Sequence, residues 1–144
     1  MPEGESHMKQ TAVLTTTSLL AIVFMTFHLA DDILFKMSPA GFSNLIALLI
    51  FVVWLYGTLV LVERRSGYII TFLGALFGLA VPIIHMRGSG GVVGGEIGKS
   101  GEAFFFVWTL LALGTTSALS LVLSARGLWS RRGAGPGRAG VRRP

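Results

Sequence analysis

No charged side chain interrupts residues 37–62, which read MSPAGFSNLIALLIFVVWLYGTLVLV. Three more runs without charge lie along the chain, at residues 10–30, 66–86 and 103–125. A helix of about 20 apolar residues crosses the hydrocarbon core of a bilayer, so each run is long enough to span it. Their length excludes a membrane β-barrel, whose strands alternate apolar and polar residues over about 10 positions.

The composition of the whole chain also indicates a membrane protein. Of the 144 residues, 52% are hydrophobic and 13% are charged, whereas an ordinary soluble domain has about 25% charged residues. The chain contains no cysteine, which excludes disulfides, thiolate metal sites and a cysteine nucleophile. The basic C-terminal residues lack interleaved aromatic side chains, so we expect the lipid bilayer as partner and no nucleic acid.

We therefore predict an all-α, polytopic membrane protein, an up-down bundle of four transmembrane helices. The predicted spans are residues 11–30, 45–62, 68–84 and 103–125, within a transmembrane domain of residues 11–129. Residues 1–10 are expected to form a cytoplasmic N-terminal segment, and residues 130–144 a disordered basic tail. The first span lacks the basic start and cleavage site of a signal peptide, so we expect it to be retained.

The connections between the spans differ in length. Ser66-Gly67 predicts a tight turn, which would make the second and third spans antiparallel neighbours. Pro82 predicts a kink or an end in the third span. Residues 86–102 contain seven glycines and are expected to form a long loop that is mobile or folded onto the membrane surface.

The positive-inside rule orients the bundle. With both termini on one side, that side carries nine Lys and Arg residues and the other carries three. Short cytoplasmic loops are rich in Lys and Arg, so we expect both termini in the cytoplasm and the protein in the cell membrane. Within the C-terminal region, Arg126, Arg131 and Arg132 are candidates for contact with anionic lipids.

Small residues mark candidate helix contacts. Gly74 and Gly78 form a G-x-x-x-G pair in the third span, which allows the backbone of another helix to approach closely. Gly114 and Ala118 lie in the second half of the fourth span. This half is rich in small and polar residues, as helix-packing surfaces in lipid tend to be. Trp54, near the middle of the second span, is expected to donate its indole N–H to another helix.

One group of residues indicates chemistry. His28 shares a helix face with Asp31 and Asp32, and His85 lies at a matched depth at the end of the third span. With Glu102, these side chains would gather at the outer face of the membrane. Imidazole and carboxylate are ligands for zinc, iron, manganese or nickel, and two histidines could instead ligate a haem inside a bundle.

Two further interpretations of this group remain open. The histidines could switch with protonation, or they could be ordinary interfacial residues, with Asp32 paired to Lys36 one helical turn later. The spacing has none of the specificity of an H-E-x-x-H motif.

The sequence contains no recognisable catalytic motif, so we favour a protein that is not an enzyme. The segment Gly94–Ser100 resembles a P-loop but has Val93 where that motif needs glycine. The leading prediction is a small accessory or interaction subunit, forming a homo-oligomer or binding a partner membrane protein. The alternatives are a metal- or haem-binding membrane protein and a small oligomeric transporter. Ion-coupled pumps usually keep a charged residue within a span, and none of the predicted spans contains one.

Overall fold

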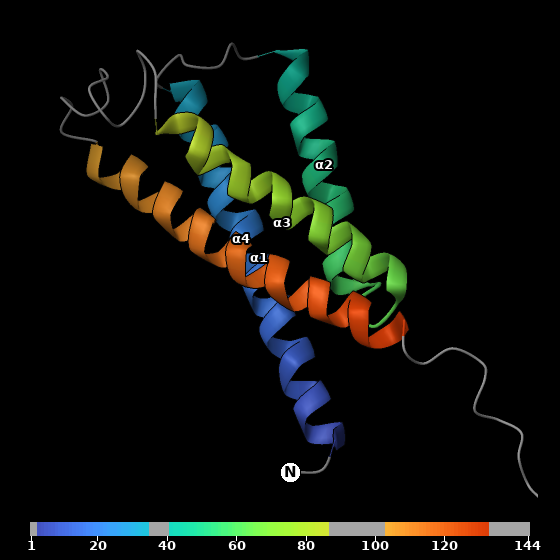
Figure 1. Ribbon diagram of the computed structural model, residues 1–144. Helices are drawn as coiled ribbons and strands as arrows, with labels where there is room; N and C mark the ends of the chain where they lie inside the picture. The colour runs from blue at the N-terminus through green and yellow to red at the C-terminus, as the bar shows by residue number, and fades with distance from the viewer. Residues whose placement is uncertain (1–2, 35–40, 87–102, 133–144) are drawn as a thin grey trace, which may run out of the picture.

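The chain folds into four antiparallel helices in an up-down arrangement, as Figure 1 shows. The structure, a computed structural model, describes residues 3–34, 41–86 and 103–132. Its elements in chain order are α1 (Glu3–Leu34), α2 (Phe42–Leu59), α3 (Arg65–His85) and α4 (Ala103–Arg132). The predicted all-α bundle of four helices is confirmed. The glycine-rich segment and the C-terminal tail lie outside the described residues, apart from Met86 at the end of α3 and the last turn of α4.

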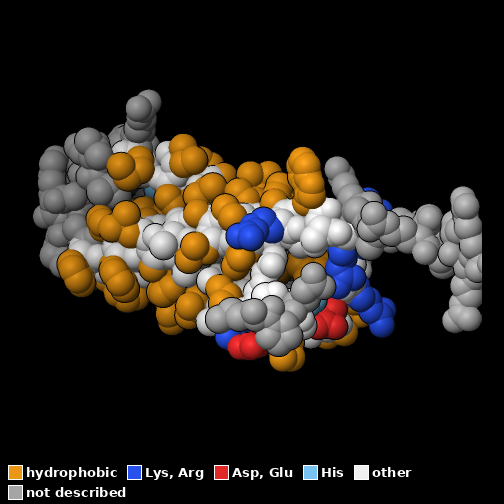
Figure 2. Space-filling model, turned by 60° about the horizontal axis from the view of Figure 1, so that its bottom comes forward, with side chains coloured by type: hydrophobic (Ala, Val, Ile, Leu, Met, Phe, Trp, Pro, Cys, Tyr) orange, Lys and Arg blue, Asp and Glu red, His pale blue; other side chains and the backbone are white. Residues whose placement is uncertain are grey.

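Three of these helices, α1, α3 and α4, are long and apolar enough to cross a membrane. The fourth, α2, has 18 residues and rises about 27 Å, slightly less than a hydrocarbon core of about 30 Å. Hydrophobic side chains cover most of the surface seen in Figure 2, and charged ones gather in one half of that view. This surface suits lipid contact and fits a protein that crosses a membrane several times.

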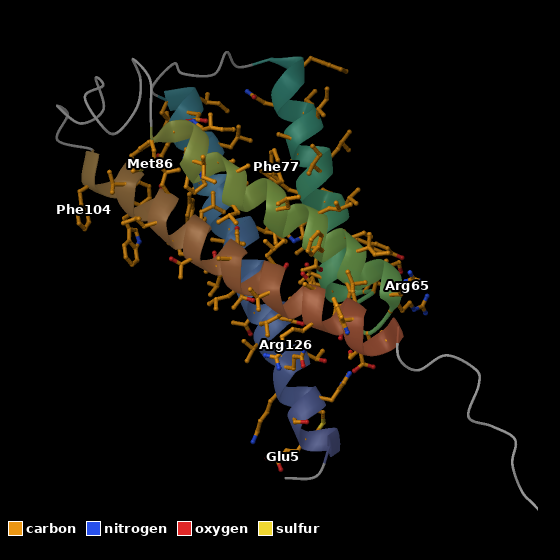
Figure 3. The ribbon with its side chains drawn as sticks, viewed as in Figure 1. Glu5, Arg65, Phe77, Met86, Phe104 and Arg126 are labelled. Atoms are coloured by element: carbon orange, nitrogen blue, oxygen red, sulfur yellow. The ribbon has the colours of Figure 1, made fainter. Side chains whose placement is uncertain are left out.

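The helices at the two ends of the chain are longer than their apolar runs. α1 begins at Glu3, not at residue 11, so the predicted N-terminal segment is mostly helical. Within this extension Lys9 forms an ion pair with Glu5 one turn earlier, a spacing that favours the helix. α4 continues to Arg132, beyond the predicted end at residue 125. Figure 3 shows Glu5 and Arg126 on these extensions.

The prediction of a tight turn at Ser66-Gly67 is wrong. α2 ends at Leu59, residues 60–64 make the connection, and α3 begins at Arg65. Gly67 lies in the first turn of α3, where an added Cβ would overlap the backbone carbonyl of Leu61. The glycine therefore allows the connection to fold back onto the helix. At the other end, α3 continues through Pro82 to His85, so the proline does not end the helix.

Small residues of α3 lie where it meets two other helices. An added Cβ at Gly74 would overlap the Trp54 indole of α2, and one at Gly78 would overlap the Ser117 hydroxyl of α4. Gly114 of α4 is less tightly packed, since a Cβ there would lie 3.4 Å from Cγ of Pro82. Ala118 of α4 is half-buried.

Buried hydroxyl groups link α1 to α2 and α4 in the middle of the bundle. The Trp54 indole donates to Ser18 Oγ at 2.9 Å, as expected for a polar handle in lipid. Ser18 also shares a hydrogen bond of 2.8 Å with Thr58, and Ser120 donates to Thr17 at 2.9 Å. These bonds fix the register of three helices, because a shifted helix would leave buried hydroxyls without partners.

We expect Trp54→Phe to lower the free energy of unfolding by about 1 kcal/mol, the usual scale for a hydrogen bond between membrane helices. The variant keeps an aromatic ring but removes the donor to Ser18. Unfolding in SDS followed by circular dichroism measures the change. Trp108→Phe is the matched control, because Trp108 is exposed on α4. Equal stability losses in both variants would contradict the assigned hydrogen bond.

Candidate metal centre

Two helix ends bring together the two histidines that the sequence singled out. His28 lies near the C-terminal end of α1, and His85 is the last residue of α3. These ends lie beside each other at the end of the bundle opposite the α2–α3 connection (Figure 1). The imidazole rings are in contact, with centroids 4.5 Å apart and planes perpendicular. The matched depth expected from the sequence thus becomes direct contact.

Asp32 lies beside both rings. Its Oδ2 atom is 3.6 Å from Nε2 of His28, one turn earlier on α1, and 3.5 Å from Nε2 of His85. The three residues each offer a ligand atom, and these atoms all lie within 4.8 Å of one another. Among the described residues, this is the group of histidines and carboxylates close enough to share one metal ion.

A backbone hydrogen bond orients His85 toward this group. Its Nδ1 lies 3.0 Å from the carbonyl oxygen of Val81. A carbonyl only accepts hydrogen bonds, so Nδ1 carries the proton and donates it. In the neutral ring the lone pair is then on Nε2, the atom that faces Asp32. Metal-binding histidines commonly have this support from a carbonyl on the second nitrogen.

His28 is buried and unsatisfied. It is 2% exposed, and neither ring nitrogen has a hydrogen-bond partner among the described residues. Its ring also packs against Phe106 of α4, with centroids 5.3 Å apart. A buried polar group without a partner costs about 1–3 kcal/mol, so a cation shared with Asp32 would offset a real penalty.

The two distances from Asp32 to the histidines fit a small divalent ion. Two ligands of a tetrahedral ion bound at about 2.0–2.2 Å lie about 3.3–3.6 Å apart. The separations of 3.5 and 3.6 Å from Asp32 to the two histidines fall in this range. Two histidines and one carboxylate leave at least one coordination position open, as zinc and non-haem iron(II) sites often do.

The same geometry does not fit a haem ligated by both histidines. The porphyrin would have to lie between the two rings, which already touch edge to face. The cavity beside them holds about 110 Å³, well below the roughly 300 Å³ of the smallest pockets for organic ligands. The haem alternative therefore has no support in the described structure.

The structure does not bring all the predicted metal ligands together at one site. Asp31 is buried, but its carboxylate is not part of the converging group. Glu102 and Lys36 lie outside the described residues, so neither the fourth ligand nor the Asp32–Lys36 pair is tested. The third histidine of the chain, His7, is exposed near the start of α1.

The basic residues lie at the opposite end. Arg126 and Arg131 are exposed on α4, and the side chain of Arg132 is not described. The Arg131 guanidinium stacks over the ring of Tyr68 at the start of α3, 5.3 Å from its centroid. Figure 3 places Arg65 and Arg126 at this end, and Met86 and Phe104 at the other.

Sequence reasoning missed two features around the cluster. Phe106 is fully buried against both histidines, whereas Phe104 and Phe105 beside it are exposed. Three consecutive phenylalanines do not reveal which one faces inward. The second feature is the small, partly open cavity that residues of α1, α2 and α3 line next to His28 and His85. Its walls come from three helices and have no local signature.

We compared the chain with protein-family models, curated proteins and solved structures, and found no match.

Proposed function

We propose that this chain is an integral membrane protein that binds one divalent transition-metal ion through His28, Asp32 and His85. Zinc and iron(II) suit this ligand set best, since imidazole and carboxylate bind both and an open position is typical of their reactive sites. The observation that carries the proposal is the convergence of two imidazole nitrogens and a carboxylate oxygen from two helices.

The electrostatics of the group support a cation rather than a simple packing role. The lone pair of neutral His85 and the carboxylate of Asp32 would repel each other at 3.5 Å. Both side chains are largely shielded from water, with 20% of His85 and 15% of Asp32 exposed, which strengthens that repulsion because charges interact more strongly away from water. A shared metal ion removes it. Protonation of one histidine would also relieve the repulsion, and the protonated site would bind no metal.

The location of the site follows from the proposed orientation. Both termini and the α2–α3 connection would face the cytoplasm of a multi-pass protein in the cell membrane, supported by the excess of Lys and Arg on that side. The metal site would then lie near the outer boundary of the membrane. Arg126, Arg131 and Arg132 would face the anionic lipids of the inner leaflet.

A role as an accessory subunit is compatible with metal binding. α2 exposes apolar residues along its outer side, among them Leu45, Leu48, Leu49 and Val52. Such a surface suits lipid as well as another membrane helix. Association with a second copy or another membrane protein, and transport by an oligomer, remain predictions. Mass spectrometry in native-like detergent would measure the assembly directly.

Titration of the purified protein with cobalt(II) tests the metal proposal. We expect one ion per chain, with the intense visible absorption of a four- or five-coordinate cobalt site, and displacement by zinc. His7→Gln is the matched control, because His7 is exposed at the other end of α1 and should leave the titration unchanged. Binding that disappears with His7, or a stoichiometry near zero, would overturn the proposal.

A further inference from the structure

Three exposed arginines from two helices lie around one buried tyrosine, at the end of the bundle opposite the histidines. Tyr68, in the first turn of α3, is 2% exposed. Arg64 and Arg65 precede it by four and three positions, so they are its neighbours on the helix surface. The guanidinium of Arg131, in the last turn of α4, lies 5.3 Å from the centroid of the Tyr68 ring. We call Arg64, Arg65 and Arg131 the Tyr68 patch.

The packing of α3 against α4 fixes Arg131 in this position. Gly127 lies one turn before Arg131, and an added Cβ there would overlap the Tyr68 ring. α4 therefore approaches Tyr68 closely at Gly127, and Arg131 extends over the ring from the same helix face. A guanidinium that stacks on an aromatic ring keeps the donors in its own plane available. Arg131 is thus oriented while its N–H groups stay free for a ligand.

The patch has no carboxylate partner among the described residues. None of the ion pairs there includes one of its three arginines. Glu63, next to Arg64, is exposed and forms no such pair. Figure 3 shows Glu5 on the start of α1, away from Arg65. The sequence after Arg132 adds three arginines and no Asp or Glu. The patch therefore carries an excess of positive charge that an external anion would balance.

Tryptophans near the two ends of α4 indicate the depth of the patch in a membrane. Trp108 and Trp129 are both exposed and lie 21 residues apart, or about 32 Å along the helix. This separation matches a hydrocarbon core of about 30 Å, and tryptophan is enriched at the two membrane–water interfaces. Arg131 lies two residues beyond Trp129. In an inserted bundle its guanidinium would lie at the level of the lipid phosphates.

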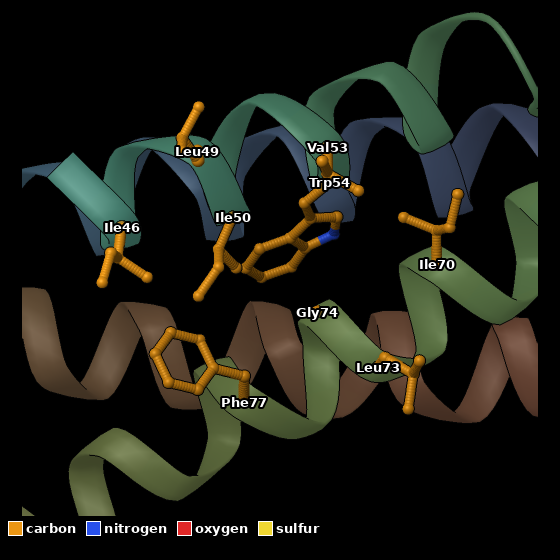
Figure 4. A pocket seen from close by; sticks show the side chains of 9 residues that line it. All are labelled: Ile46, Leu49, Ile50, Val53, Trp54, Ile70, Leu73, Gly74 and Phe77. Carbon is orange, nitrogen blue, oxygen red and sulfur yellow. The ribbon is translucent and has the colours of Figure 1, made fainter.

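The surface on the membrane side of the patch is apolar. Exposed side chains of α3 and α4 here include Ile69, Leu73 and Val122. An open groove of about 460 Å³ between α2 and α3 is also lined by apolar side chains, such as Ile50 and Phe77 (Figure 4). Acyl chains that extend from a headgroup at the patch would meet an apolar surface in every direction, so no single groove has to hold them.

We propose that the Tyr68 patch binds the phosphate headgroup of one anionic phospholipid, from the leaflet at this end of the bundle. Guanidinium groups donate pairs of parallel hydrogen bonds to phosphate oxygens. Arg64 and Arg65 approach the headgroup from α3, and Arg131 approaches it from α4. The inference rests on the proposed insertion in a membrane and deepens the proposed lipid contact of α4. It does not depend on the metal ion.

Arg126 separates a discrete site from diffuse attraction. It precedes Arg131 by five residues, so the two side chains leave α4 about 140° apart. Figure 3 shows Arg126 well away from Arg65. Both Arg126 and Arg131 are exposed, and both would attract an anionic membrane surface to a similar extent. Only Arg131 belongs to the patch.

Native mass spectrometry of the full chain in a neutral detergent tests the proposal. The probes are phosphatidylglycerol, which has a net negative headgroup, and phosphatidylcholine with the same acyl chains, whose headgroup is neutral overall. We expect one phosphatidylglycerol per chain, bound at least about tenfold more tightly than phosphatidylcholine. Inorganic phosphate at the same concentration should not displace the lipid, because it has no acyl chains to contact the apolar surface.

Two matched arginine variants locate the site. Arg131→Gln should weaken phosphatidylglycerol binding at least about tenfold, since hydrogen bonds between charged groups are the strong ones. Arg64→Gln combined with Arg65→Gln should have a similar effect. Arg126→Gln removes the same charge from α4 and should change binding less than about twofold, because a neutral micelle has no charged surface to attract. Circular dichroism checks that each variant keeps its helices.

Three results would overturn the proposal. Equal binding of the two lipids would show that negative charge is not recognised. Displacement by inorganic phosphate would identify a free anion as the ligand. Equal losses in the Arg126 and Arg131 variants would leave only the diffuse attraction proposed for α4. The cobalt titration does not depend on any of these results, so failure of this inference is distinguishable from failure of the metal proposal.

Discussion

Asp32→Asn will weaken cobalt(II) binding by more than about 100-fold while leaving the helical bundle intact. Removing groups that merely support metal ligands costs about 10- to 100-fold in affinity, and Asp32 is proposed as a ligand itself. Asparagine has almost the same size, so the packing between His28 and His85 should be kept. The change also removes the negative charge that lies 3.5 Å from His85 Nε2. Isothermal titration calorimetry and the cobalt absorption spectrum measure the effect.

Asp31→Asn is the control for this experiment. It removes the same charge from the adjacent residue, which is more buried than Asp32 and whose carboxylate lies outside the converging group. We expect it to change cobalt affinity less than about tenfold, through the long-range field alone. His28→Gln and His85→Gln should each resemble Asp32→Asn. Similar losses in the Asp31 and Asp32 variants would mean that general negative charge, rather than this ligand set, holds the ion.

Gly74→Ala will lower the free energy of unfolding by about 1–3 kcal/mol, as overpacking in a close-packed interior does. The added methyl group would overlap the Trp54 ring. That ring is buried and is held by its hydrogen bond to Ser18, so it has little freedom to move away. The loss should appear as a shift of the SDS unfolding transition.

Gly114→Ala is the corresponding control on α4. A Cβ at Gly114 would make an ordinary contact of 3.4 Å with the Pro82 ring. Alanine also favours helix over glycine by about 1 kcal/mol in water. We therefore expect unchanged or slightly higher stability. A Gly74 variant that is as stable as the Gly114 variant would show that α2 and α3 pack differently from the arrangement described here.

The number of helices followed from the sequence because membrane insertion depends on local composition. In lipid, the backbone groups of an apolar segment must all be hydrogen-bonded within the protein. A helix satisfies them within a single segment, so each charge-free run predicts one helix. The helix ends were less predictable. The extension of α1 to Glu3 rests on residues that are not apolar, and the connection after Leu59 replaces the turn expected at Ser66-Gly67.

The candidate site was predictable only in part. Helical spacing placed His28 and Asp32 on one face of α1, because residues four apart are neighbours on any helix. It could not choose between Asp31 and Asp32, which differ by one position and both lie near that face. The choice depends on where α3 lies, since His85 approaches from that helix.

Four apolar helices, three of them long enough to cross a membrane, and the residues among which a site should be sought can all be predicted from the sequence. Local hydrophobicity and helical periodicity are sufficient for both conclusions. Packing between helices is what brings His28, Asp32 and His85 together, sets Phe106 against both histidines, and leaves a groove between α2 and α3. These features depend on how helices distant in the chain pack, which Gly74, Gly78 and Trp54 control through contacts between helices.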